Sequence, residues 1–159
     1  MQKEIVFFLK NLRDEIIAAF QSFESSSKFE RKNWNHHTGG GGEISILRGS
    51  VFEKAAVNWS GVSGETFPMQ DGTGPFFATG ISLITHMQNP HAPTVHMNLR
   101  YIETKNDFWF GGGYDLTPMG FFYEDDKQHF HETANKALDP FGEKLYQEFS
   151  KNAAAYFYI

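Results

Sequence analysis

Cysteine is absent from the 159-residue sequence. Its absence excludes disulfides, thiolate metal sites and a cysteine nucleophile. Long apolar runs are absent too: no uninterrupted apolar segment approaches the roughly 18 residues of a membrane-spanning helix, and the N-terminus carries no apolar signal segment. We therefore expect a protein of the cytoplasm without a membrane span.

Positive charge is in short supply. The chain has 14 Lys and Arg residues against 19 Asp and Glu residues, which gives a formal net charge of −5 at pH 7. A protein whose main partner is nucleic acid or an anionic membrane normally presents a basic patch. The composition therefore argues against both partners, and any anionic ligand must be bound by a few locally placed basic side chains.

Aromatic residues, in contrast, make up 16% of the chain, and 40% of all residues are hydrophobic, which suits one domain with a true core. Apolar residues at helical spacing predict an amphipathic helix over residues 1–24. Residues 61–75, rich in glycine and proline, predict a loop. We expect an α+β fold in which a large antiparallel sheet is flanked by helices. The strands are expected at 43–48, 51–60, 77–85, 94–104 and the start of 108–118, and further helices at 119–137 and 140–158.

The stretch from Ala78 to Ile102 predicts two strands joined by a proline-bearing loop. Side chains two apart in a strand share a face, so His96 and Arg100 lie on one face of the second strand. If the strands pair with His86 opposite His96, then Ser82 falls opposite Arg100. This register brings these polar side chains and that of Asn98 to one surface of the sheet.

Such a polar surface is costly to bury without partners, so we expect it to line a cleft or to meet an anionic ligand. Arg100 can hold a carboxylate or phosphate with two hydrogen bonds, and His96 can move a proton near neutral pH. Asp115 follows a triple glycine, and its local alternative is an Asx-turn or a helix cap. Histidines together with Asp115 are also typical of a non-haem iron or other divalent metal site.

Other candidates are weaker. The adjacent His36 and His37 are typical of a surface loop. The glycine run 39–42 lacks the Lys-Ser/Thr and helix start of a phosphate-binding loop, which favours close backbone approach or a mobile lid. His129 and His131 are two apart on a predicted helix, so they do not face each other and at most one can join the hairpin histidines.

Taken together, the motifs resemble one family, the oxygen-dependent coproporphyrinogen III oxidases of haem biosynthesis. They occur in that family's order and spacing and cover nearly all of the chain. The matching segments are Trp34 with 39–42, Val51-Phe-Glu-Lys-Ala-Ala-Val-Asn58, Gly80-Ile-Ser-Leu83, His86 with Asn89-Pro-His-Ala-Pro-Thr-Val-His-Met-Asn-Leu-Arg100, Trp109-Phe-Gly-Gly-Gly-Tyr-Asp-Leu-Thr-Pro118 and His129-Phe-His131.

The resemblance implies an oxidoreductase that converts two propionates of coproporphyrinogen III to vinyl groups, giving protoporphyrinogen IX. Dioxygen is the implied co-substrate, no organic cofactor takes part, a divalent metal cation is a possible addition, and the assembly is a homodimer. By position, the resemblance assigns proton donation to His96, contact with the pyrrole nitrogens to Asp115, substrate binding to Ser82, Asn98, Leu99 and Arg100, and metal binding to His86, His96 and His131.

The chain also departs from the family pattern. It is about half the family's length, so we expect a single domain over residues 1–159 that is truncated at its C-terminus. The segment 58–64 lacks two histidines common in the family, and Glu43 stands where a basic residue is usual. An alternative function is therefore a catalytically silent fragment or degenerate copy that only binds a tetrapyrrole or a homologous chain. An iron-dependent dioxygenase on another fold is a third hypothesis.

Overall fold

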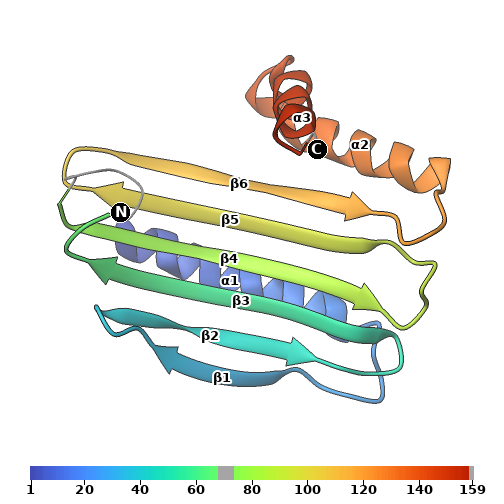
Figure 1. Ribbon diagram of the computed structural model, residues 1–159, viewed down its shortest axis with the longest axis horizontal. Helices are drawn as coiled ribbons and strands as arrows, with labels where there is room; N and C mark the ends of the chain where they lie inside the picture. The colour runs from blue at the N-terminus through green and yellow to red at the C-terminus, as the bar shows by residue number, and fades with distance from the viewer. Residues whose placement is uncertain (68–73, 158–159) are drawn as a thin grey trace. The chain divides into compact units, whose positions relative to one another are not determined.

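The computed structural model describes residues 1–67 and 74–157 of the chain. Contacts divide it into two compact units, Met1–Gly120 and Phe121–Ile159. The first unit contains one helix and a six-stranded antiparallel sheet in which every strand pairs with its neighbour in sequence, as Figure 1 shows. Its elements are α1 (Gln2–Gln21), β1 (Glu30–Asn35), β2 (Gly40–Leu47), β3 (Phe52–Gly64), β4 (Phe76–Met87), β5 (Thr94–Thr104) and β6 (Phe108–Thr117).

Helix α1 packs on one face of the sheet, over β3 and β4 (Figure 1). Its buried residues Leu9 and Ile17 lie on one stripe of the helix, as expected from their spacing. Ile17 forms a core cluster with Val57 of β3 and Leu83 of β4. Burial of each such side chain contributes about 1.5–3 kcal/mol, so this contact decides which face of the sheet is covered.

A second core cluster lies where β2 turns into β3. Leu47, Phe52 and Ala55 are buried there, and the rings of Phe20 and Phe52 lie 5.8 Å apart. A register irregularity between Phe52 and Lys54 interrupts the pairing with β4. The bulge lets Phe52 join Ala55 on the side of α1, since strict alternation would have turned it away.

Four charged side chains connect α1 to β1 and β2. The guanidinium of Arg13, only 7% exposed, contacts Asp14 at 3.0 Å and Glu43 at 3.1 Å, and Arg31 contacts Asp14 at 2.7 Å and Glu43 at 3.6 Å. A buried charge is tolerated only when it is paired. Glu43 therefore has a structural role as the partner of Arg13, on the side of the sheet that faces α1.

The buried carboxylate of Glu24 fastens the end of α1 to the turn between β2 and β3. It accepts hydrogen bonds from the Ser26 amide at 3.0 Å, the Ser26 hydroxyl at 2.5 Å, the Ser50 hydroxyl at 2.9 Å and the Val51 amide at 2.8 Å. These hydrogen bonds lower the pKa of Glu24 from 4.5 to about 2, and the bond from the Ser26 hydroxyl has the largest effect. Desolvation of the carboxylate opposes them by raising the pKa. Hydrogen bonds to the ionised form stabilise that form.

Glu24 should therefore make folding stability depend on acidity. Because its pKa is lowered in the folded state, its stabilisation is present above pH 4.5 and is lost as the pH falls toward about 2. We expect Glu24→Gln to lower the melting temperature at pH 7 and to flatten the fall in melting temperature below pH 4.5. Thermal unfolding followed by circular dichroism from pH 2 to 7 measures both effects. The exposed α1 variant Glu15→Gln is the matched control, and equal behaviour of the two variants would contradict the assignment.

The second unit consists of α2 (Glu124–Leu138), the short 3-10 helix η1 (Asp139–Phe141) and α3 (Leu145–Tyr156). Acidic residues fill the first turn of α2, and Lys136 lies in its last turn, an arrangement that complements the helix dipole. The Tyr146 hydroxyl of α3 is hydrogen-bonded to Nδ1 of His131 at 2.7 Å. The two predicted C-terminal helices are thus confirmed, although each starts later than expected.

The antiparallel sheet and the α+β class are confirmed, but several segment predictions differ from the structure. Strand β1 was not predicted, and β3 continues to Gly64 although 61–75 was predicted as a loop. Five of the six residues of β1 are exposed, so this edge strand has no hydrophobic alternation to indicate it. Residues 68–73 of the predicted loop lie outside the described residues. The prediction of a single domain over 1–159 stays a prediction. No helix among the described residues is long and apolar enough to cross a membrane.

Candidate functional site

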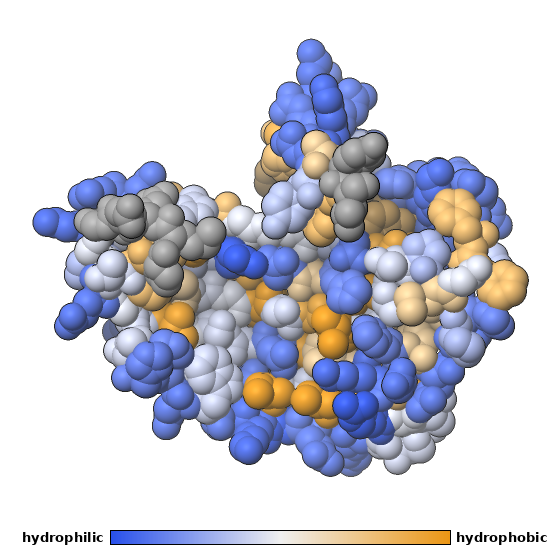
Figure 2. Space-filling model, in the orientation of Figure 1, coloured by the Kyte–Doolittle hydropathy of each residue, from blue (hydrophilic) through white to orange (hydrophobic). Residues whose placement is uncertain are grey.

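The candidate site lies on the face of β3–β6 turned away from α1, called the distal face below. In β5, Met97 packs toward the α1 core, so His96, Asn98 and Arg100 project to the distal face. Figure 2 views this side of the sheet and shows polar side chains interspersed with hydrophobic patches over the strands. The distal face carries the predicted residues Ser82, His86, His96, Asn98, Arg100 and Asp115.

The predicted register of the hairpin is wrong, although its faces are right. Ile84 lies opposite His96, and Ser82 lies opposite Asn98, where the prediction paired His86 with His96 and Ser82 with Arg100. The reason is the turn. The Asn89 side chain accepts a hydrogen bond from the His91 amide, and the Ala92 amide bonds to the Asn89 carbonyl. This Asx-turn shifts the pairing by two residues, which preserves the face of every side chain because the period of a strand is two.

Strand β6 brings Asp115 directly opposite His96. The Nδ1 atom of His96 lies 2.9 Å from Oδ1 of Asp115, and the Thr117 hydroxyl donates to the same oxygen at 2.8 Å. A carboxylate only accepts, so Nδ1 of His96 is the donor and Nε2 is the nitrogen left to exchange a proton. Asp115 lies inside a paired strand, which rules out the local alternative of an Asx-turn or a helix cap.

Arg100 and Asn98 form the second polar pair of the distal face. Oδ1 of Asn98 accepts hydrogen bonds from Nε of Arg100 at 3.2 Å and from Nη2 at 2.9 Å. These two bonds hold the exposed guanidinium along the strand. A guanidinium oriented in this way can bind a carboxylate. Ser82, opposite Asn98, is also exposed and adds a hydroxyl to the same row.

The register separates Leu99 from this group. Leu99 lies between Asn98 and Arg100, so its side chain projects to the α1 side of the sheet. Any contact that it makes on the distal face must come from its backbone.

The histidines form no complete metal site within the described residues. The rings of His86 and His96 lie 6.1 Å apart at 88°. His131 belongs to the second unit and is bonded to Tyr146 through Nδ1. No group of three or more His, Cys, Asp or Glu side chains in the described part of the chain is placed to hold a metal ion. The residues present therefore offer a pair of imidazoles but no preformed metal centre.

An aromatic wall that the sequence analysis did not identify bounds the distal face at the end of β5 and the start of β6. Phe67, 7% exposed, packs against Phe76 at 5.5 Å and against Trp109 at 5.7 Å between ring centroids. Trp109 pairs with Ile102 and so shares the face of Arg100. The alternation of β6 could have indicated Trp109, but no periodic pattern places Phe67, which lies in a loop.

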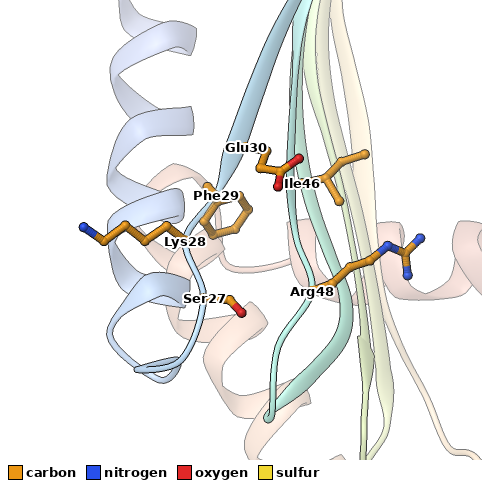
Figure 3. A pocket seen from close by; sticks show the side chains of 6 residues that line it. All are labelled: Ser27, Lys28, Phe29, Glu30, Ile46 and Arg48. Carbon is orange, nitrogen blue, oxygen red and sulfur yellow. The ribbon is translucent and has the colours of Figure 1, made fainter.

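A separate depression lies at the other edge of the sheet, between the segment before β1 and the end of β2 (Figure 3). The side chains of Lys28 and Arg48 extend in opposite directions there, and Arg48 donates to the Glu53 carbonyl at 3.1 Å. The depression is lined by Ser27, Lys28, Phe29, Glu30, Ile46 and Arg48. None of the predicted site residues lines it, so it is distinct from the candidate site.

An imidazole–carboxylate pair and a guanidinium–amide pair lie on one face of the sheet, and side chains of these kinds can bind an organic anion and exchange a proton. The sequence profile of the family described as Coproporphyrinogen III oxidase matches residues 4–159. The chain therefore belongs to the coproporphyrinogen III oxidase family.

Several relatives carry the name oxygen-dependent coproporphyrinogen-III oxidase. The protein of Rickettsia bellii (strain OSU 85-389) is 42% identical over 167 residues, which cover 94% of this chain and 58% of the relative. That of Synechococcus sp. (strain CC9605) is 40% identical, covering 93% and 43%. That of Coxiella burnetii (strain Dugway 5J108-111) is 38% identical, covering 98% and 54%. The chain thus spans about half the length of the curated relatives it matches.

The aromatic wall should contribute measurably to stability. We expect Phe67→Ala to lower the free energy of unfolding by about 3 kcal/mol, because it removes a buried ring and leaves a cavity against Trp109. Urea denaturation followed by tryptophan fluorescence measures the change. Phe7→Ala, at a position 68% exposed in the same unit, is the control and should change stability by less than about 0.5 kcal/mol. Equal effects of the two variants would show that Phe67 is not buried in solution.

Proposed function

We propose that the chain carries the substrate-binding face of an oxygen-dependent coproporphyrinogen III oxidase. This enzyme converts two propionates of coproporphyrinogen III to vinyl groups and yields protoporphyrinogen IX. One observation carries the proposal: in a chain of this family, the His96–Asp115 pair and the Arg100–Asn98 pair lie on a single face of the sheet. The names of the relatives agree with this activity.

The chemistry of the substrate matches the two pairs. Propionates are anionic, and Arg100 supplies a guanidinium held in place by Asn98. The pyrrole nitrogens are N–H donors that need acceptors. Oδ1 of Asp115 takes the bonds from His96 and Thr117, and Oδ2 has no hydrogen bond among the described residues. Oδ2 is thus the acceptor that we assign to a pyrrole N–H.

The reaction needs proton exchange next to the ring. For each vinyl group, the carboxylate leaves as carbon dioxide, and the side chain also loses a proton and two electrons in forming the carbon–carbon double bond. Dioxygen accepts the electrons. Protons must be delivered or removed close to these atoms, and we assign this exchange to Nε2 of His96, whose Nδ1 is held by Asp115. The role of Asp115 toward His96 is to orient the imidazole.

Further features of the family belong to the same proposal. We infer that Ser82 and the backbone of Leu99 contact the substrate. From the family resemblance we also propose His86, His96 and His131 as ligands of a divalent cation. Neutral imidazoles suit such a cation, which would supply Lewis-acid assistance. We also propose a cytoplasmic homodimer.

Turnover of the purified chain tests the function. After aerobic incubation with coproporphyrinogen III, the porphyrins are oxidised and separated by chromatography, and a mono- or divinyl product is expected. His96→Ala should lower the rate by about 10²–10⁴-fold because proton exchange is lost, while His37→Ala at the β1–β2 turn should retain it. Binding of the substrate without product would instead favour a silent, binding-only copy.

Arg100 should contribute to affinity through charge. We expect Arg100→Ala to weaken the binding of coproporphyrinogen III by roughly 1.5–3 kcal/mol through loss of a charge-assisted hydrogen bond to a propionate. Equilibrium dialysis without oxygen measures the dissociation constant. Arg48→Ala removes the same charge outside the distal face and should leave the affinity unchanged. An unchanged affinity for Arg100→Ala would mean that this guanidinium does not bind the substrate.

A further inference from the structure

Two glycines of β6, Gly111 and Gly113, occupy positions where the fold of the described chain does not require glycine. Neither has a positive φ angle, so the backbone is open to any residue. Among the described residues, a Cβ atom added at Gly113 would meet nothing within 4 Å, and one added at Gly111 would meet Cγ of Arg100 alone, at 3.8 Å, which is an ordinary contact. A glycine inside a strand weakens that strand. Both glycines therefore lower the stability of β6, and the fold gives no reason for them.

Neighbouring glycines show the contrast. A Cβ atom at Gly112, on the opposite face, would lie 2.4 Å from the Asn98 carbonyl oxygen, and one at Gly80 would lie 2.5 Å from the Leu99 carbonyl oxygen. Close packing of the backbone therefore explains Gly112 and Gly80. It does not explain Gly111 and Gly113.

The position of the two glycines indicates what they make room for. Gly113 lies opposite Asn98 and Gly111 lies opposite Arg100, so both open onto the distal face. Along β6 they fall between Trp109 of the aromatic wall and Asp115. The stretch from Trp109 to Asp115 is roughly 20 Å long, and its centre is bare backbone. Asn98 and Arg100 of β5, and Trp109 and Asp115 of β6, thus border a stretch of this edge strand that has no side chain on the distal face.

We propose that Gly111 and Gly113 form a glycine shelf that determines substrate size: the tetrapyrrole macrocycle lies against the β6 backbone between Asp115 and Trp109. Arg100 then reaches a propionate at the rim, and Asp115 reaches the pyrrole nitrogens. This inference rests on the proposed function and deepens it, because it assigns a specificity-determining role to residues that touch neither the proton nor the carboxylate.

Substitution at Gly113 distinguishes an effect on ligand binding from an effect on the stability of the fold. The Cβ atom of Gly113→Ala enters empty space, so the variant should melt at the same or a higher temperature than the native chain. Its affinity for coproporphyrinogen III should fall several-fold, and Gly113→Val, with a larger side chain, should lose more than 10-fold. Ser63→Thr adds one methyl group at an exposed β3 position on the opposite face and should change neither quantity.

Affinity is measured by equilibrium dialysis under anaerobic conditions, so that no turnover occurs, followed by oxidation of the ligand to its fluorescent porphyrin. Native binding with weakened binding by both stable Gly113 variants supports the shelf. Native binding with equal affinity in a folded Gly113→Ala and a folded Gly113→Val overturns the shelf and leaves the proposed function intact. If Gly113→Val does not fold, unchanged affinity of Gly113→Ala overturns it. Failure of the native chain to bind coproporphyrinogen III overturns the shelf and the proposed function together.

Discussion

Packing of α1 against β3 and β4 is the constraint on which the site depends. The Ile17, Val57 and Leu83 cluster commits one face of the sheet to the core. Side chains alternate between the two faces of a strand. Once α1 covers one face, every polar residue of the opposite phase therefore lies on the distal face. The site is therefore positioned by apolar contacts on the far side of the sheet, and its own hydrogen bonds only orient side chains that are already together.

The same division between faces resolves the role of Glu43. An acidic residue after the glycine run would repel an anionic ligand if it lay on the distal face. It instead lies on the α1 side, where Arg13 and Arg31 contact its carboxylate. Glu43 thus pairs with basic side chains on the α1 side, and the acidic and basic side chains that the register places on the distal face are those of Lys54, Arg100 and Asp115.

Sequence periodicity correctly predicted which face of a strand each residue occupies. It did not predict the register between strands or the tertiary contacts. His96, Asn98 and Arg100 were correctly placed on one face because a period of two is insensitive to a two-residue slip. The partners of these residues were misplaced, since the Asx-turn at Asn89 sets the register and hydrophobic pattern carries no information about it. Strand β1 is an edge strand held by its pairing with β2 and by the contact of Arg31 with Asp14. The contacts of Glu24 with Ser50 and Val51, and of Phe67 with Trp109, join residues that no local pattern connects.

The order of the strands has a consequence for how the chain acquires its structure. Each strand after β1 pairs with the one that precedes it, so the strand pairings join neighbouring parts of the sequence at low entropic cost. The contact of Ile17 with Leu83 is different, because it joins distant parts of the chain. During synthesis on the ribosome, α1 has no completed surface to cover until β4 has emerged. Although α1 precedes the sheet in the sequence, its core contact with Leu83 requires β4, so the distal face is defined only when the helix and β4 are both in place.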